Sequence, residues 1–281
     1  EEGWSVSSTT VGRMLNELGY RLQSVNKRNE GKSDPDRNAQ FEHINSTAET
    51  YQAQGQPVIS VDTKKKELVG DFKNNGREWQ PKGTPECALV HDFPQDAIGK
   101  AVPYGVYDMA RNEACVNVGQ SCDTPKFAVA SIRRWWTSMG KRAYPHAHSL
   151  LITADAGGSN GYRSRVWKHE LQKFADDANL CICVCHFPPG TSKWNKIEHR
   201  LFCHITKNWR GKPLRTFETV VELIANTRTQ AGLRVEAKLD KRKYKKAVVV
   251  TKEQMDALLL LRNDFRGDWN YELRPRTNLV T

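Results

Sequence analysis

The chain alternates between short apolar runs and longer segments with helical spacing, which predicts an α/β protein. The continuous apolar runs at 149–154 and 181–185 are typical of strands buried on both faces of a parallel sheet. Two runs in sequence within 100–119 indicate an antiparallel meander. The pattern therefore predicts one mixed sheet, built from the runs VISVD, KAVPYGVYDMA, EACVNVG, SLLITAD and LCICVCHF.

Helices are predicted between these runs, at residues 5–22, 41–54, 124–139, 163–178, 193–209 and 216–224, and from Thr251 through Leu261. The first helix, capped by Ser7 or Ser8, resembles the second helix of a helix-turn-helix motif, whose N-terminal residues read base edges. Ser8, Thr9 and Arg13 are its candidate DNA contacts. The alternative is a packing helix without a special role.

Composition divides the chain into four parts. Residues 1–25 are a partial helix-turn-helix segment, and residues 26–54 are a polar linker with a connecting helix. Residues 55–230 hold the catalytic core, and residues 231–281 form a basic C-terminal extension. The chain starts at Glu1 rather than Met, so we expect a fragment or a processed product that lacks an N-terminal piece.

Charge indicates the kind of partner. The net charge of +11 over 281 residues favours a polyanion such as nucleic acid, although an ordinary basic protein has the same charge. Lys241, Arg242 and Lys243 lie in the most basic stretch and are candidate phosphate contacts. The odd count of seven cysteines, the absence of a signal peptide and the absence of a membrane-length apolar run favour a reducing cytoplasm without membrane contact.

Three carboxylates are the candidate chemistry. Asp62 and Asp155 end two predicted strands, and Glu198 lies on a later helix. Three carboxylates brought together repel one another unless a divalent cation lies between them, and hard oxygen ligands suit Mg²⁺ or Mn²⁺. Two such ions would clamp the attacking and leaving oxygens of a phosphoryl displacement. No GxxxxGK[ST] motif is present, so a nucleoside triphosphatase is not indicated.

Other residues have a functional and a structural interpretation. Cys181, Cys183 and Cys185 share one face of a strand, but such spacing does not easily wrap a tetrahedral metal, so burial is favoured. Lys193 and Asn195 precede Glu198 and are candidate phosphate contacts. Weaker candidates are Ser159 and Asn160 as supports of the second aspartate, His199 as a water-orienting group, and Lys64, Lys65 and Lys66, which a solvated strand face explains equally well.

The segments VDTKKKE, ADAGGSNGYR and HFPPGTSKWNKIEH, in this order, resemble the catalytic segments of the ISAzo13-like (Rhodopirellula-type) insertion-sequence DDE transposases, related in plan to the IS630 and Tc1/mariner group. The resemblance covers nearly the whole chain. It implies an RNase H-like core preceded by helix-turn-helix elements, with Asp62, Asp155 and Glu198 as the metal-binding catalytic residues.

The resemblance also implies partners. They are double-stranded DNA, as the terminal inverted repeats of the element and the target, and a second copy of the chain in a homodimer on paired ends. A transposase of this kind acts in a prokaryotic cytoplasm, associated with the nucleoid. Two alternatives stay open: an RNase H-like structure-selective nuclease without strand transfer, and a non-catalytic DNA-binding protein with a vestigial site.

Overall fold

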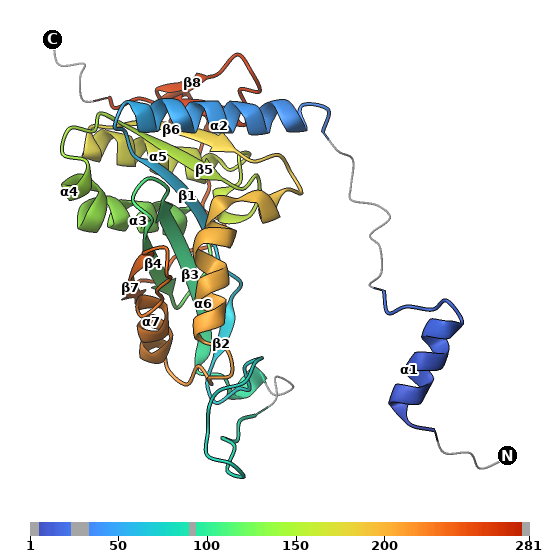
Figure 1. The fold of residues 1–281 in the computed structure, drawn as a ribbon. Coiled ribbons are helices and arrows are strands. Elements are labelled where there is room, and N and C mark those ends of the chain that lie inside the picture. The colour runs from blue at the N-terminus through green and yellow to red at the C-terminus, as the bar shows by residue number, and fades with distance from the viewer. Residues whose placement is uncertain (1–5, 24–33, 90–93, 277–281) are drawn as a thin grey trace. The chain divides into compact units, whose positions relative to one another are not determined.

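The computed structural model describes residues 6–23, 34–89 and 94–276, in two compact units, Glu1–Ser33 and Asp34–Thr281 (Figure 1). The first unit contains helix α1 (Ser8–Glu17), which is shorter at both ends than the predicted helix. Ser7 caps it by accepting a hydrogen bond from the Thr10 N–H, and Gly19 follows its end with a φ of +82°. Most of the predicted linker lies outside the described residues.

The second unit is built on a nine-stranded mixed sheet with the order β7-β4-β3-β1-β5-β6-β9-β8, with β2 paired to β3. This confirms the predicted mixed α/β sheet flanked by helices. The strands are β1 (Val58–Thr63), β2 (Glu67–Val69), β3 (Gly99–Asp108), β4 (Glu113–Gly119), β5 (Ser149–Ala154), β6 (Cys181–His186), β7 (Arg234–Asp240), β8 (Leu260–Arg262) and β9 (Asn270–Leu273).

Strand direction places the carboxyl ends of β1, β5 and β6 at one edge, because these three strands are mutually parallel. The meander β3–β4 is antiparallel to β1, as predicted. β2 and β1 both pair with β3 in the antiparallel sense. The chain after Asp62 therefore continues in the direction of β1.

The part predicted as a basic C-terminal extension, residues 231–281, is integrated into the sheet. β7 pairs with β4, and β9 pairs with both β6 and β8. The compact unit therefore begins at Asp34 and extends beyond the predicted core of residues 55–230. Long-range pairing of this kind leaves no local signal in a basic sequence.

Helices cover both faces of the sheet (Figure 1). On one face, α3 (Pro125–Trp135) and α5 (Arg165–Ala178) bury Trp135, Trp167 and Leu171 against the sheet. On the other face lie α2 (Arg37–Ala53), α6 (Cys203–Asn208) and α7 (Phe217–Ala225). The even-numbered residues of β1, including Asp62, point toward this second face by the period of two.

Three predicted helices have different bounds in the structure. α2 begins at Arg37 rather than at residue 41. Just before it, the Asp34 carboxylate accepts a hydrogen bond from the N–H of Asp36, the N-cap residue. The helix that contains Glu198 begins at Lys196, and Trp194 before it is exposed rather than packed. The last helix, α8 (Lys252–Asp256), ends early because Leu260 and Leu261 pair with β9 as strand β8.

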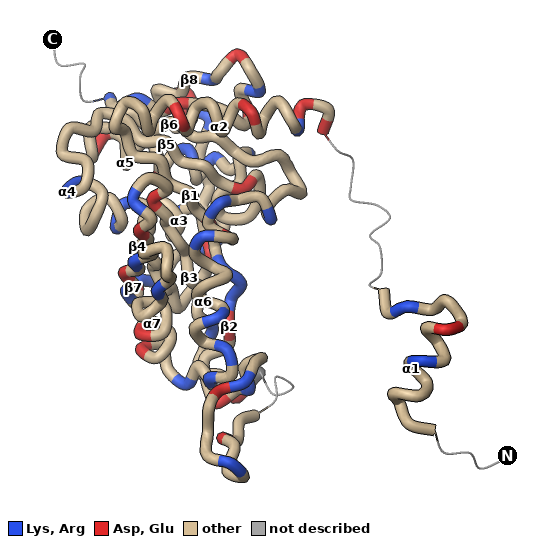
Figure 2. Tube along the Cα trace, in the orientation of Figure 1, with Lys and Arg blue, Asp and Glu red and all other residues tan. Residues whose placement is uncertain are grey.

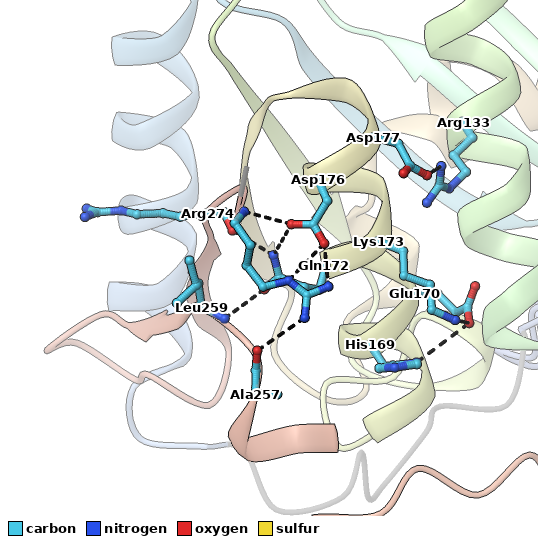
Figure 3. Close-up of polar contacts among 11 residues, drawn as sticks. Arg133, His169, Glu170, Gln172, Lys173, Asp176, Asp177, Ala257, Leu259 and Arg274 are labelled. Carbon is cyan, nitrogen blue, oxygen red and sulfur yellow. Dashed lines mark hydrogen bonds and ion pairs between the residues drawn. The ribbon is translucent and has the colours of Figure 1, made fainter. Parts of the chain in front are cut away.

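Side-chain hydrogen bonds fasten the C-terminal segment to α5 (Figure 3). Gln172 accepts from the Leu259 N–H at 2.9 Å and donates to the Arg274 carbonyl at 2.7 Å. Asp176 accepts from the backbone and guanidinium of Arg276. No helix within the described residues is long and apolar enough to cross a membrane.

Candidate active site

Asp62 and Asp155 are brought together by the pairing of β1 with β5. Val61 lies opposite Ala154 in the parallel register, so Asp62 and Asp155 are the next residues along two adjacent strands. Both are partly buried, and both line one cavity of about 830 Å³. The prediction that these two aspartates share one edge of the sheet is confirmed.

Glu198 is the first residue of a π-helical segment, η5 (Glu198–Phe202), that leads into α6. A π-helical turn inside an α-helix is frequent at functional sites, because the extra residue changes the direction of the side chains around it. Glu198 is half-buried on the cavity side of the buried stripe formed by Ile197, Leu201 and Ile205.

Gly105 allows this helix to approach the sheet. It pairs with Asp62 across β1 and β3. A Cβ atom at position 105 would lie 2.7 Å from the Phe202 ring and 2.8 Å from the Ile197 side chain, closer than real Cβ contacts. The absence of a side chain at this position therefore sets how near Glu198 lies to Asp62.

Asn195 connects the strands to the helix entry. Its amide nitrogen donates to Asp155 Oδ1 at 3.0 Å and to the Val61 carbonyl at 3.2 Å. Its amide oxygen accepts from the Ser60 hydroxyl, which itself accepts from the Ile197 N–H. Asn195 was predicted to contact a substrate phosphate; in the structure it is fully buried and its hydrogen bond holds the Asp155 side chain.

His186 supports the backbone of Asp155. Its Nδ1 lies 3.0 Å from the Asp155 carbonyl oxygen, which only accepts, so Nδ1 holds the proton and donates. Nε2 then accepts from the Tyr271 hydroxyl at 2.9 Å, and that hydroxyl accepts from Trp167 Nε1 at 2.8 Å. Burial lowers the pKa of His186 to about 4, so the ring is neutral and both nitrogens are occupied.

The electrostatics of the cavity disfavour negative charge. Burial, together with the charge of Asp155, raises the pKa of Asp62 to about 8, although the Thr63 N–H stabilises the carboxylate at 2.7 Å. Burial raises the pKa of Asp155 to about 6, against the opposing effect of the Asn195 amide. Burial also raises the pKa of Glu198, which Lys64 and His199 oppose. A cation is the natural partner of such a group of carboxylates.

The donor set fits a divalent cation only in part. Asp62 and Asp155 offer oxygen ligands, and Mg²⁺ commonly takes one or two carboxylates together with substrate phosphates. Glu198 is not among the residues that line the cavity, and within the described ranges no three His, Cys, Asp or Glu side chains are grouped closely enough to hold one ion. A three-carboxylate set therefore requires the Glu198 side chain to move toward the aspartates.

The cavity also contains residues that sequence reasoning missed. Asp123 lines it and accepts from the Thr63 hydroxyl at 3.1 Å, and Lys66 pairs with Asp123 at 3.7 Å. Tyr162 and Arg163 line its rim, with the guanidinium 5.1 Å from the Tyr162 ring centre. The only sequence signal for Asp123 is its place directly before Thr124, the cap of α3.

The Lys64–Lys66 run divides between two environments. Lys65 and Lys66 are exposed, as a solvated strand face predicts. Lys64 is buried, and its ammonium lies 4.4 Å from the Trp209 ring centre and 3.5 Å from Glu67. Lys64 therefore packs under the helix of Glu198 and places a positive charge near that carboxylate.

The remaining candidates form no hydrogen bond to the side chains of Asp62, Asp155 or Glu198 among the described residues. Ser159 and Asn160 contact Thr63 and Tyr104 rather than Asp155, so they attach their loop to β1 and β3. His199 Nε2 contacts the Lys193 carbonyl at 2.5 Å. The exposed residues among the candidates are Ser8, Thr9, Arg13, Lys193, Lys241, Arg242 and Lys243.

Arg242 and the cysteines of β6 both contact other residues of the protein. The Arg242 guanidinium forms a fork on the Asp240 carboxylate, at 2.8 and 2.6 Å, and its hydrogen bonds lower the pKa of this buried carboxyl. All seven cysteines are free, and Cys183 and Cys185 pack with Ile44 and Ala48 of α2. Burial is thus the role of these strand cysteines in the structure.

Two aspartates on parallel strands of a mixed sheet, with Glu198 on the helix beside them, offer oxygen ligands of the kind that hold divalent ions for phosphoryl transfer. The profile of the family described as Rhodopirellula transposase DDE domain matches residues 1–275, and the chain belongs to this family. The resemblance found in the three sequence segments is therefore confirmed. No curated protein sequence matches the chain.

Solved structures of Mos1 transposase are similar to this chain over 77% of its length. The paired-end complex with the left transposon end has a TM-score of 0.48 at 12% identity. The pre-cleavage Mos1 transpososome has a TM-score of 0.46 at 12% identity, and the paired-end complex with Mn has 0.43 at 13%. The chain spans about three fifths of the Mos1 chain, 61% in the first of these structures.

Proposed function

We propose that this protein is a DNA transposase that cuts and joins DNA strands at the ends of an insertion sequence. The observation that carries the proposal is the pair Asp62 and Asp155, adjacent on parallel strands and facing one cavity. Membership in the transposase DDE domain family supports the assignment of this pair to strand cleavage and transfer.

Asp62, Asp155 and Glu198 would hold the metal, Mg²⁺ or Mn²⁺, and two ions match in-line displacement at a phosphodiester. Among the Mos1 structures, one paired-end complex was solved with Mn and another with Mg, which supports divalent ions here. A bound ion would supply Lewis-acid activation of water or of a DNA 3′-hydroxyl. Asn195 and His186 fix Asp155 from its side chain and from its backbone.

The substrate would be double-stranded DNA, as terminal inverted repeats and target. Blue Lys and Arg positions gather near β2 and α6 in Figure 2; in sequence, Lys64, Lys65 and Lys66 precede β2 and Lys207 lies in α6. Lys65, Lys66 and Arg163 line the cavity and would contact phosphates on either side of the scissile bond. Lys193, Lys241 and Lys243 are exposed and extend the basic surface, whereas Arg242 is committed to Asp240.

End recognition would belong to the N-terminal unit. Ser8, Thr9 and Arg13 are exposed at the start of α1, and Arg13 pairs with the exposed Glu17 at 3.9 Å. Residues 1–25 would thus act as a partial helix-turn-helix segment, joined by the linker within 26–54 to the catalytic part. Two copies would bind paired ends as a homodimer, at the nucleoid of a prokaryotic cytoplasm.

The test is a cleavage and joining assay with labelled terminal-repeat DNA and Mg²⁺ or Mn²⁺. Asp62→Asn, Asp155→Asn and Glu198→Gln should each lower nicking by about 10³-fold or more, a loss typical of removing groups on which the transition state depends, while DNA binding stays nearly intact. Asp177→Asn, which removes an exposed carboxylate paired with Arg133, is the control and should nick normally.

The same assay separates the alternative functions. Joined products between labelled ends and a target plasmid support a transposase, and nicking without joining supports a structure-selective nuclease. DNA binding without metal-dependent nicking by the wild type supports a vestigial site. Nicking at the wild-type rate by any one of the three variants would remove that residue from the catalytic set.

A further inference from the structure

A second charged cavity, of about 460 Å³, lies at the end of the sheet away from the carboxylates. Its lining includes Arg111, Arg142, Arg228 and Arg234, with Glu113 and Glu236 as the only acidic members. Glu113 is three residues before Val116, which pairs with Gly105 opposite Asp62, so the cavity begins about 10 Å along the strand from the active site.

Four separate elements deliver these arginines. Arg111 lies in the turn between β3 and β4, and Arg234 begins β7 directly opposite Glu113. Arg228 follows the end of α7. Arg142 lies in the short helix α4 (Lys141–Ala143), after a second π-helical segment, η2 (Trp136–Gly140). Their convergence on one cavity is a property of the fold and not of a basic run in the sequence.

The charges in the cavity are not balanced. Glu113 pairs with Arg111 at 3.0 Å and with Arg234 at 3.8 Å, so one carboxylate serves two guanidiniums. Arg228 donates to the carbonyls of Ala225 and Thr227, at 2.7 and 2.8 Å, and no carboxylate of the described residues pairs with it. The Arg142 side chain makes no hydrogen bond or ion pair with any of the described residues.

The π-helical segment explains the orientation of Arg142. An extra residue in the helical turn rotates the following residues around the helix axis. Met139 of this segment lines the same cavity as Arg142, whereas the neighbouring Lys141 lines a different cavity, with Tyr144 and Asp177. Arg142 and Lys141 thus carry the same charge on the same short helix and face different surroundings.

We propose that this arginine cavity binds phosphate groups. Guanidinium forks match the geometry of phosphate oxygens, and the four arginines that line the cavity outnumber its two carboxylates. The phosphates belong either to the backbone of a DNA segment that passes the far end of the sheet, or to a free phosphate compound. Basic and acidic residues alternate along β7, where Arg234, Glu236, Lys238 and Asp240 follow one another (Figure 2), so the cavity rather than the whole edge attracts the anion.

The experiment uses the full chain and two probes. Binding of pyrophosphate is measured by titration calorimetry, and binding of a random-sequence DNA duplex is measured over a series of salt concentrations. Arg142→Ala is the test variant, and Lys141→Ala is the matched control that removes the same charge from the adjacent position. Both positions are exposed, so equal thermal unfolding of the two variants verifies that folding is intact.

Arg142→Ala should weaken pyrophosphate binding by about tenfold or more, as expected for a lost charge-assisted hydrogen bond, and Lys141→Ala should change it by less than about twofold. If the ligand is DNA, Arg142→Ala also weakens duplex binding and reduces its salt dependence by about one ion. If duplex binding is unchanged, the ligand is a free phosphate compound. Equal effects of the two variants on both probes would overturn the proposal.

Only the DNA outcome rests on the proposed transposase function, and the pyrophosphate measurement does not. Pyrophosphate binding that depends on Arg142 in a protein that never nicks DNA would retain the phosphate cavity while removing the proposed function. Nicking that depends on Asp62, together with equal pyrophosphate binding by Arg142→Ala and Lys141→Ala, would support the proposed function and remove the phosphate cavity.

Discussion

The two aspartates and the glutamate of the candidate active site are positioned by different interactions. Asp62 and Asp155 follow from the hydrogen-bonded register of β1 and β5, which fixes each backbone to within a fraction of a residue. Glu198 follows from the packing of Ile197 and Phe202 against the sheet and from the hydrogen bond of the Ile197 N–H to the Ser60 hydroxyl.

This difference between strand pairing and helix packing determines which half of the site can move. The aspartates are held by ladder hydrogen bonds, by Asn195 and by His186. The glutamate begins a π-helical turn and does not line the cavity of the aspartates. The strand half is therefore rigid in register, whereas the helical half has to close for three carboxylates to hold metal.

Disturbing the helical half alone, with all three carboxylates kept, should lower nicking strongly. Gly105→Ala places a Cβ atom against the buried Phe202 and Ile197 side chains, so the Glu198 helix must shift away from Asp62. Because misplacement of a catalytic group by about 1 Å can cost on the order of 10²-fold, nicking should fall by about that factor. The measurement is the nicking rate at saturating metal and DNA.

Gly119→Ala is the matched control. It also forces a Cβ atom into a ring, 2.8 Å from Phe127, but on the face covered by α3. Each variant should lower the free energy of unfolding by about 1–3 kcal/mol through overpacking, and only Gly105→Ala should lose nicking. Equal loss of nicking by both variants would show that general strain, and not the position of Glu198, limits the reaction.

The strand half should also affect stability, apart from the loss of nicking expected when Asp62 is replaced. The raised pKa of Asp62, about 8 in the folded protein, means that the folded state binds more protons than the unfolded state between about pH 4 and 8. The charged carboxylate therefore destabilises the metal-free fold increasingly as pH rises through that window. Asp62→Asn should remove this penalty.

The expected gain is about 2 kcal/mol or more at pH 8 and close to zero at pH 4, which corresponds to a rise in Tm of roughly 5 °C at the higher pH. It is measured by thermal unfolding in the presence of a chelator. Asp177→Asn, at an exposed ion pair, should give little change at either pH. A gain that is the same at pH 4 and pH 8 would contradict the burial of charge at Asp62.

Much of the strand half was predictable from sequence, because its signals are local. The continuous apolar run before Asp155 is that of a doubly covered strand, and two such strands in one sheet place their final residues together. Asp62 and Asp155 therefore required no knowledge of the rest of the chain beyond the parallel pairing.

The helical half was only partly predictable. Apolar spacing locates Ile197, Leu201 and Ile205 on one face, but a π-helical turn at Glu198 has no simple sequence pattern. The burial of Asn195 and Lys64 was missed because polar side chains are usually assigned to solvent, whereas here each has specific partners. Asp123 enters the cavity through a loop whose course depends on tertiary packing.

Nonlocal strand pairing explains the other failures. Leu260 and Leu261 have helical neighbours in sequence, yet they pair with β9, which itself pairs with β6. The same pairing incorporates the predicted C-terminal extension into the sheet. Pattern along the chain cannot anticipate a partner strand that is fixed by contacts across the whole unit.

Binding of Mn²⁺ to the protein at pH 8, measured by titration calorimetry, tests the shared carboxylate site most directly. The wild type should bind Mn²⁺, Asp62→Asn and Asp155→Asn should each weaken binding by about tenfold or more, and Asp177→Asn should bind as the wild type does. Binding of Mn²⁺ by Asp62→Asn or Asp155→Asn with wild-type affinity would contradict a metal site shared by these two aspartates.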